Sequence, residues 1–288
     1  MHTVATFSIV ACDLRAQAWG VAVASKFPAV GAIVPWARAK AGAVATQANA
    51  NTSFGPRGIE AMATGRSAYE TLRDLLARDR DREHRQVGIV DAEGGSATFT
   101  GKLCSDWAGG VSGKGYAIQG NILSSPDVVR QMEQTFLENR GDLPGRLLAA
   151  LEAGGHAGGD RRGRQSAALI VVKPRAGYGG HNDRWIDYRV DDHLNPIPRL
   201  IELLEIHRLY FGKSPSSQRL RLHGEPVREM QAIMKGLGYY TPTDGEYDDA
   251  TREAFRAFIS NENFEERADP DAGWIDRPVF DYLLKKLK

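Results

Sequence analysis

The sequence has few cysteines, and this scarcity excludes several kinds of protein. Only Cys12 and Cys104 occur among 288 residues, too few for a disulfide framework and without the Cys/His spacing of a zinc site. The seven histidines show no paired spacing such as HExxH, so we expect neither a metal nor a cofactor. Both thiols are predicted to be reduced and to lie in or near the core.

Charge of one sign and long apolar runs are also missing. Thirty-seven basic against thirty-six acidic residues give a net charge of +1, which provides no global attraction to nucleic acid or to an anionic membrane. No run of about 18 apolar residues is present to span a membrane. The N-terminus lacks the basic and apolar segments of a secretion signal. We therefore predict a cytoplasmic protein that binds neither nucleic acid nor a membrane.

The length of the chain predicts two domains. A chain of 288 residues exceeds the size at which a single core stops growing, about 250 residues. Residues 212–218 contain no large apolar side chain, which is typical of a linker. The sequence thus predicts a first domain over 1–211, a linker over 212–221 and a small domain over 222–288.

Short apolar runs separated by turns dominate the first domain. The expected strands cover residues 7–12, 20–25, 42–47, 86–90, 96–100, 116–121, 165–172 and 185–190. The expected helices cover residues 59–77, a segment that starts near Pro126, residues 147–153 and residues 198–210. Antiparallel strands interrupted by paired helices favour an α+β protein, a four-layer αββα sandwich.

Five ordered motifs resemble one bacterial family. They are TFSIVA at 6–11, GVAVASK at 20–26, GAVATQ at 42–47, QGN at 119–121 and GDRRGRQSAA at 159–168. Together they resemble the domain of unknown function 1028 family over about residues 5–208. That family is placed by fold among the N-terminal nucleophile (Ntn) hydrolases, so the resemblance implies the αββα fold.

The resemblance also implies a nucleophile. In Ntn hydrolases a Thr, Ser or Cys begins the mature chain and uses its own α-amine, whose pKa is near 8, as general base. Thr6 is the matching residue, but Met1 to Ala5 precede it. Three alternatives stay open: a start codon assigned upstream of the true one, self-cleavage before Thr6, or a chain that is not a Thr hydrolase.

Further candidates lie at strand ends. Ser8 shares a face of the first strand with Thr6 because side chains alternate along a strand. Ser25 and Lys26 end the second strand, where the superfamily keeps a Lys or polar group that stabilises an oxyanion. Asn121 is a candidate for the oxyanion hole. The alternatives are strand-filling hydroxyls, a solvated Lys and a turn-capping Asn.

The polar segment before residue 167 supplies the remaining candidates. Asp160 is assigned a supporting catalytic role, and Arg162 can bind a carboxylate or amide-bearing substrate bidentately. The predicted substrate-binding residues are Gln47, Arg162, Gln165 and Ser166. The alternative is a charged surface loop after Gly154 and Gly155.

The C-terminal segment predicts three amphipathic helices. Apolar side chains recur at helical spacing within 226–240 and 249–258, and a third helix is expected over 278–287. The pattern resembles the three-helix peptidoglycan-binding modules over about residues 222–287. These motifs are packing features, so both binding of peptidoglycan fragments and a docking or homo-oligomerisation role stay open.

Two functional hypotheses follow. The first is an Ntn-type amidohydrolase that acts on a small amide or peptide-like substrate through Thr6. The second is a non-catalytic binding or scaffold protein that keeps the sandwich but exposes no nucleophile. A free α-amine on Thr6 distinguishes the two.

Overall fold

The computed structural model describes residues 6–239 and 242–287. These residues form two compact units that divide between Leu203 and Leu204. Met1 to Ala5, which precede the expected nucleophile, and Tyr240, the last residue of one expected helical segment, lie outside the described residues.

The first unit contains a six-stranded antiparallel sheet. Its strands, in spatial order, are β10 (Arg184–Val190), β9 (Ser166–Val172), β2 (Ala18–Ser25), β1 (Thr6–Asp13), β8 (Tyr116–Asn121) and β7 (Gly109–Gly113). The long runs of Val, Ala and Ile in β1, β2 and β9 suit strands that are buried on both faces. Their central position in the sheet follows from that burial.

A second antiparallel sheet faces the first. Its four strands, in spatial order, are β3 (Pro35–Arg38), β4 (Gly42–Ala48), β5 (Arg85–Asp91) and β6 (Ser96–Thr100). Small and β-branched side chains such as Val10, Val23, Ala45 and Val90 fill the space between the two sheets. The core of the unit therefore lies between the sheets.

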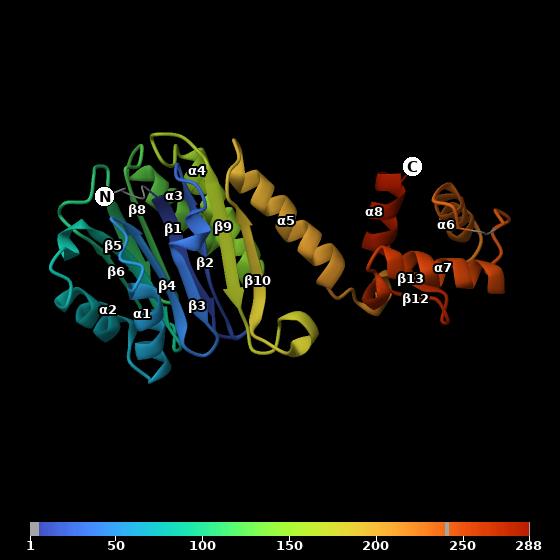
Figure 1. The fold of residues 1–288 in the computed structure, drawn as a ribbon, viewed down its shortest axis with the longest axis horizontal. Coiled ribbons are helices and arrows are strands. Elements are labelled where there is room, and N and C mark those ends of the chain that lie inside the picture. Colours follow the sequence, from blue (N-terminus) through green and yellow to red (C-terminus); the bar gives the residue numbers. More distant parts are fainter. Residues whose placement is uncertain (1–5, 240–241, 288) are drawn as a thin grey trace. The chain divides into compact units, whose positions relative to one another are not determined.

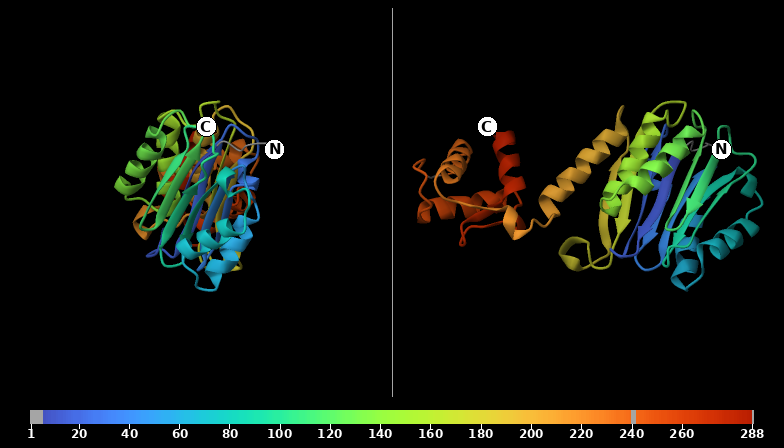
Figure 2. Two further views of the ribbon diagram at one scale, coloured as in Figure 1. Left: turned by 90° about the vertical axis from the view of Figure 1, so that its left-hand side faces the viewer. Right: turned by 180° about the vertical axis from the view of Figure 1, so that it is seen from behind.

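Paired helices cover the outer face of each sheet. The helices are α1 (Phe54–Ala63), α2 (Ala68–Ala77), α3 (Asp127–Glu138) and α4 (Leu143–His156). The first two pack on the four-stranded sheet and the other two on the six-stranded sheet (Figures 1 and 2). The predicted αββα sandwich is confirmed.

The structure differs from the predicted elements at a few places. The helix expected over 59–77 is two helices, because Gly65 takes a φ of +88° and Ser67 starts α2 with a capping box to Glu70. Two edge strands were not expected, β3 and β7. Pro35 and the glycines of β7 have low strand propensity, so neither strand can be recognised from its residue types.

The connecting helix α5 (Pro196–Phe211) begins in the first unit and ends in the second. The second unit adds three helices, α6 (Glu225–Gly236), α7 (Asp249–Asn261) and α8 (Arg277–Leu287). Buried aliphatic and aromatic side chains, among them Phe255, Phe258 and Phe280, form its core. The prediction of a helical C-terminal domain is confirmed.

The linker predicted over 212–221 needs correction. Residues Arg219–Arg221 form β11, which pairs with β13 (Trp274–Asp276), and β13 also pairs with β12 (Ala268–Asp269). Arg267 donates hydrogen bonds to the carbonyl of Gly212 and to Ser214 Oγ. This segment is part of the second unit, because backbone pairing outweighs its polar composition.

Candidate active site

One row of polar residues crosses the end of the six-stranded sheet. Thr6 of β1 lies directly opposite Asn121 of β8 on one side and Ser25 of β2 on the other. Ser25 in turn lies opposite Ser166 of β9. All four side chains are buried, at most 2% exposed. The register thus brings three of the predicted catalytic residues, Thr6, Ser25 and Asn121, into one row on one face.

Thr6 is the first residue of β1, and a hydrogen bond to a neighbouring strand orients its hydroxyl. Thr6 Oγ1 donates a hydrogen bond to Ser25 Oγ at 3.3 Å. Gln47 Nε2 donates to the Thr6 carbonyl, also at 3.3 Å. The hydroxyl of Thr6 therefore points toward β2, and its carbonyl bonds to the facing sheet.

Ser8 shares the face of Thr6, as alternation predicted, but it belongs to the interior. Ser8 Oγ donates to Gln47 Oε1 and accepts from Gln119 Nε2, both at 2.6 Å. Since the hydroxyl uses its donor and one acceptor site within the chain, its observed role is to join the two sheets. Gln47, predicted to bind substrate, is the other half of that bridge.

A buried glutamine that the sequence analysis did not select completes the bridge. Gln86 Oε1 accepts hydrogen bonds from Gln47 Nε2 and Asn121 Nδ2, each at 2.9 Å. Gln86 Nε2 donates to Thr100 Oγ1 at 2.9 Å and to the Gly120 carbonyl at 2.8 Å. Its signal in the sequence is a Gln at the start of a short apolar run, Val87 to Val90, and its burial is visible only in the structure.

Asp160 ties the end of β2 to the loop that precedes β9. Its side chain is 1% exposed and accepts hydrogen bonds from the backbone N–H groups of Lys26 and Arg162. The guanidinium of Arg162 pairs with both carboxylate oxygens and also donates to the Lys26 carbonyl. The bidentate partner of Arg162 is thus a residue of its own loop, while Lys26 is exposed.

The other predicted substrate-binding residues also hold loops in place. Gln165 Nε2 donates to Asp192 Oδ1 at 3.1 Å. Ser166 Oγ accepts from the N–H of Val30 and donates to the carbonyl of Phe27. Both side chains therefore support the turns that surround the end of the sheet.

A small pocket lies on the other face of the sheet. Phe7, Ala24, Gly159, Asp160 and Ile197 are among its lining residues, and its cavity volume is about 70 Å³. Phe7 alternates with Thr6 and Ser8 along β1, so it points to the opposite face. Ser25, which accepts the hydrogen bond from the Thr6 hydroxyl, also lines the pocket, whereas Thr6 itself is not among the lining residues.

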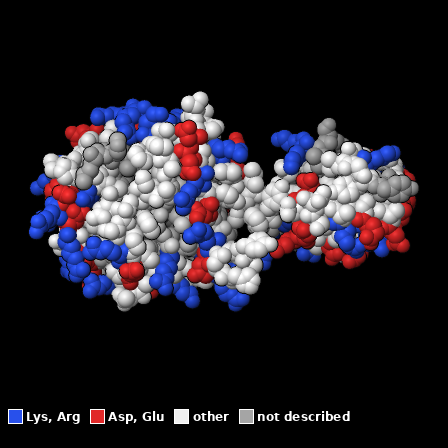
Figure 3. Space-filling model, in the orientation of Figure 1, with Lys and Arg blue, Asp and Glu red and all other residues white. Residues whose placement is uncertain are grey.

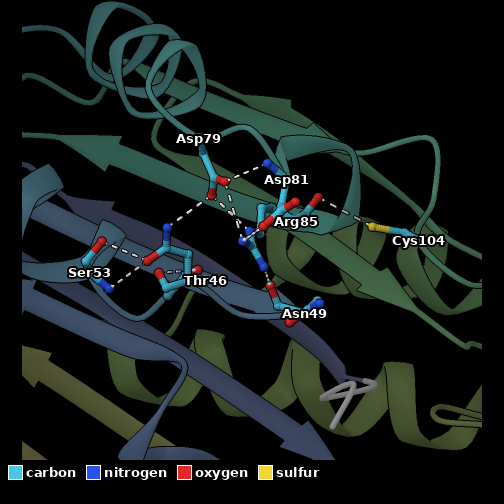
Figure 4. A network of polar contacts seen from close by, with 8 residues as sticks. Thr46, Asn49, Ser53, Asp79, Asp81, Arg85 and Cys104 are labelled. Atoms are coloured by element: carbon cyan, nitrogen blue, oxygen red, sulfur yellow. Dashed lines mark hydrogen bonds and ion pairs between the residues drawn. The ribbon is translucent and has the colours of Figure 1, made fainter. Parts of the chain in front are cut away.

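A charged cluster closes the same end of the four-stranded sheet (Figure 4). Arg85, the first residue of β5, donates through Nε to Asp79 Oδ2 at 2.9 Å, and both side chains are 8% exposed. Burial alone would raise the pKa of Asp79, but hydrogen bonds from Arg85 and Asn51 outweigh burial and lower that pKa to about 2. Arg85 also donates to the carbonyl of Asn49, so the cluster fixes the loop after β4.

Several broader features bear on function. Within residues 6–239 and 242–287, no three His, Cys, Asp or Glu side chains gather as a metal site. No helix in the same ranges is long and apolar enough to cross a membrane.

Cys12 and Cys104 are free, as predicted, and burial raises the pKa of Cys12 to about 12. On the face of the first unit seen in Figure 3, basic side chains are interspersed with acidic and uncharged ones.

Comparisons with known proteins decide the family. Residues 6–200 match the protein-family model described as "Family of unknown function (DUF1028)". The chain belongs to the DUF1028 family. A DUF1028 protein from Silicibacter pomeroyi, known from a crystal structure, shares 30% sequence identity with this chain. The two structures superpose with a TM-score of 0.64, and the match covers 71% of this chain and 89% of that chain. The predicted family resemblance is confirmed, and the match begins at Thr6.

The second unit has its own match. Residues 210–283 match the model described as "Putative peptidoglycan binding domain", which confirms the resemblance seen in the sequence. Among curated proteins, no match was found. The DUF1028 description carries no reaction, so a function must be argued from the site.

Proposed function

We propose that the DUF1028 unit is an amidohydrolase of the N-terminal-nucleophile type, with Thr6 as nucleophile. The observation that carries the proposal is the position of Thr6. It starts β1 between two polar neighbours, Ser25 and Asn121, and its Oγ1 lies 3.3 Å from Ser25 Oγ. A small amide or peptide-like compound is the proposed substrate.

Thr6 itself supplies both the nucleophile and the general base. Its α-amine accepts the hydroxyl proton while Oγ1 attacks the substrate carbonyl carbon, which gives a tetrahedral oxyanion. The C–N bond then breaks, and the leaving amine takes the proton from the α-ammonium. Water, deprotonated by the same amine, attacks the ester, and the C–O bond to Thr6 breaks to release the acid and restore the hydroxyl.

The neighbours of Thr6 have different roles in this proposal. Ser25 holds Oγ1 in one rotamer, and Asn121 lies on the opposite side. Asp160 fixes the end of β2 through the Lys26 N–H, so it acts through position. Lys26 is proposed to stabilise the oxyanion, and Gln47, Arg162, Gln165 and Ser166 to shape the substrate site through the turns and sheet contacts that they hold.

The α-amine must be free, so residues 1–5 must be absent from the active form. A start at Thr6 and cleavage of the Ala5–Thr6 bond both give that form. Three chains test the proposal: the full chain, a chain that starts at Thr6, and the latter with Thr6→Ala. Each is incubated with a panel of chromogenic small amides, and its mass is measured.

We expect hydrolysis only by the chain that starts at Thr6. Ser8→Ala in that chain should lower the rate less than Thr6→Ala, because Ser8 acts through the sheet bridge. Turnover by the Thr6→Ala chain, or by a full chain whose mass shows that residues 1–5 are still attached, would remove Thr6 from the mechanism.

One observation favours a second function, a binding or scaffold protein. Thr6 is fully buried, and it is not among the residues that line the pocket described above. The resemblance of residues 210–283 to a peptidoglycan-binding domain supports cell-wall fragments as the bound partner, although a cytoplasmic location, our sequence prediction, would keep the chain from intact wall. Co-sedimentation of the full chain with insoluble peptidoglycan, competed by soluble fragments, tests this function. Analytical ultracentrifugation tests the proposed homo-oligomer.

A further inference from the structure

The orientation of a buried amide beside Thr6 is fixed by the backbone. Gln86 Nε2 donates to the carbonyls of Gly109 at 3.2 Å and Gly120 at 2.8 Å. A carbonyl oxygen only accepts, so the nitrogen of Gln86 must face these groups and its oxygen must face away. Gln86 Oε1 is therefore a fixed acceptor.

The fixed acceptor determines which way Asn121 points. Asn121 Nδ2 donates to Gln86 Oε1 at 2.9 Å, and the reversed amide would bring two acceptor oxygens together. Asn121 Oδ1 is left buried without a hydrogen-bond partner among the described residues. An unpaired acceptor in the protein interior is costly, so this atom indicates a donor that is missing from the arrangement described.

The backbone nitrogen of Thr6 faces the same side. The N–H of Cys12 donates to the carbonyl of Gly115 on the β8 side at 2.9 Å, and the register from there to Thr6 and Asn121 has no shift. Hydrogen-bonding direction alternates with a period of two along an antiparallel strand. The nitrogen of Thr6 is therefore directed toward β8, where the register pairs its N–H with the backbone carbonyl of Asn121, while the hydroxyl is directed toward Ser25. A terminal α-ammonium group carries three hydrogen atoms, so it can also donate to the side chain of Asn121.

We propose that Asn121 Oδ1, oriented by Gln86, accepts a hydrogen bond from the α-amino group of Thr6 once Thr6 is the first residue. This inference rests on the proposed function and changes the role expected for Asn121, from an oxyanion-hole donor to an acceptor. Both Asn121 and Gln86 are positioning residues. When one N–H of the Thr6 amine donates to Asn121, the lone pair of the amine is directed away from β8. It then faces the Thr6 hydroxyl, which the amine must deprotonate.

The test measures the pKa of the Thr6 α-amine in the chain that starts at Thr6, by NMR titration of 13C-labelled threonine. The Thr6 signal is identified by its absence from Thr6→Ala. An acceptor stabilises the ammonium form, so Asn121→Leu should lower this pKa by about one unit. Gln86→Leu should lower it by less, because Asn121 keeps its oxygen but loses its orientation.

Gln119→Leu is the matched control. Gln119 lies on the same face of β8 and bonds to Ser8, so this variant loses a comparable buried amide but should leave the pKa unchanged. Asn121→Ala replaces Asn121→Leu if the larger side chain prevents folding, which thermal unfolding detects. An unchanged pKa in the Asn121 variant, or an equal fall in Gln119→Leu, would overturn the inference.

The readout separates this inference from the proposed function. The pKa requires no substrate, so a chain that hydrolyses nothing still shows whether Asn121 contacts the amine. An active chain whose pKa does not respond to Asn121 would overturn the inference and leave the amidohydrolase proposal standing.

Discussion

Gly88 of β5 lies directly against the side chain of Gln119 of β8. A Cβ atom placed on Gly88 would lie 2.1 Å from Gln119 Oε1 and 2.6 Å from its Cδ. Gln119 is itself held by Ser8 and Thr98, so it has little freedom to move. The close approach of the two sheets beneath Thr6 therefore depends on the absence of a side chain at residue 88.

Gly88→Ala should destabilise the first unit. The added methyl group forces the Gln119 amide out of its hydrogen bonds, and overpacking of this kind costs about 1–3 kcal/mol. The measurement is the free energy of unfolding in urea. Gly236→Ala, at a helical position with nothing within 4 Å of the new Cβ, is the control and should be neutral or stabilising. Equal stability of Gly88→Ala and the parent would show that the sheets are not tightly joined at this point.

The Arg85–Asp79 pair should make stability depend on pH in acid. The pKa of Asp79 is lowered to about 2, from about 3.9 in an unfolded chain. Its stabilisation is therefore complete above pH 4 and is lost as the pH falls from about 4 to 2, which amounts to roughly 2 kcal/mol. Asp79→Asn should show a smaller loss of stability in that window than the parent.

Arg85→Leu tests the same pair from the other side. It leaves a buried carboxylate without its cation, which should cost about 3–5 kcal/mol near neutral pH. Thermal unfolding followed by circular dichroism measures both variants. A parent and an Asp79→Asn variant with parallel pH profiles would contradict the lowered pKa.

Asp160→Ala should lower stability more than a surface substitution does. The variant removes acceptors from the N–H of Lys26 and from the backbone and guanidinium of Arg162. Loss of hydrogen bonds to a buried charged group predicts a cost of about 2–4 kcal/mol in urea unfolding. Asp127→Ala, which breaks an exposed ion pair with Arg130, should cost less than about 1 kcal/mol. Similar costs for the two variants would argue against a structural role for Asp160.

Much of the fold could be predicted from the sequence, because the spacing of apolar residues along a segment and the residue types in it indicate which of its faces are buried. The runs at 7–12, 20–25 and 165–172 are apolar on both faces and lie near the centre of the larger sheet. Two of the edge strands, β3 and β7, could not be predicted in the same way. Pro35 in β3 and the glycines of β7 carry little local preference, and neighbouring strands impose their extended form.

The candidate site was predicted in part for a similar reason. Thr6, Ser25 and Asn121 all stand at strand ends, and the register of three adjacent strands places them in one row. Gln86 was missed because its partners come from neighbouring strands and from the facing sheet, and no local pattern encodes those pairings. Arg162 was expected to bind substrate, but the turn from Asp160 brings its guanidinium onto a carboxylate of the same loop.

Covalent labelling of Thr6 tests the central claim most directly. A small β-lactone is opened by attack of Thr6 Oγ1 on its carbonyl carbon, so the protein gains the full mass of the reagent and a fragment spectrum locates it. We predict one adduct, on Thr6, in the chain that starts at Thr6, and none at that site when residues 1–5 are attached or in Thr6→Ala. No adduct on Thr6 in the chain that starts there, or equal labelling of the Thr6→Ala chain, would contradict the account.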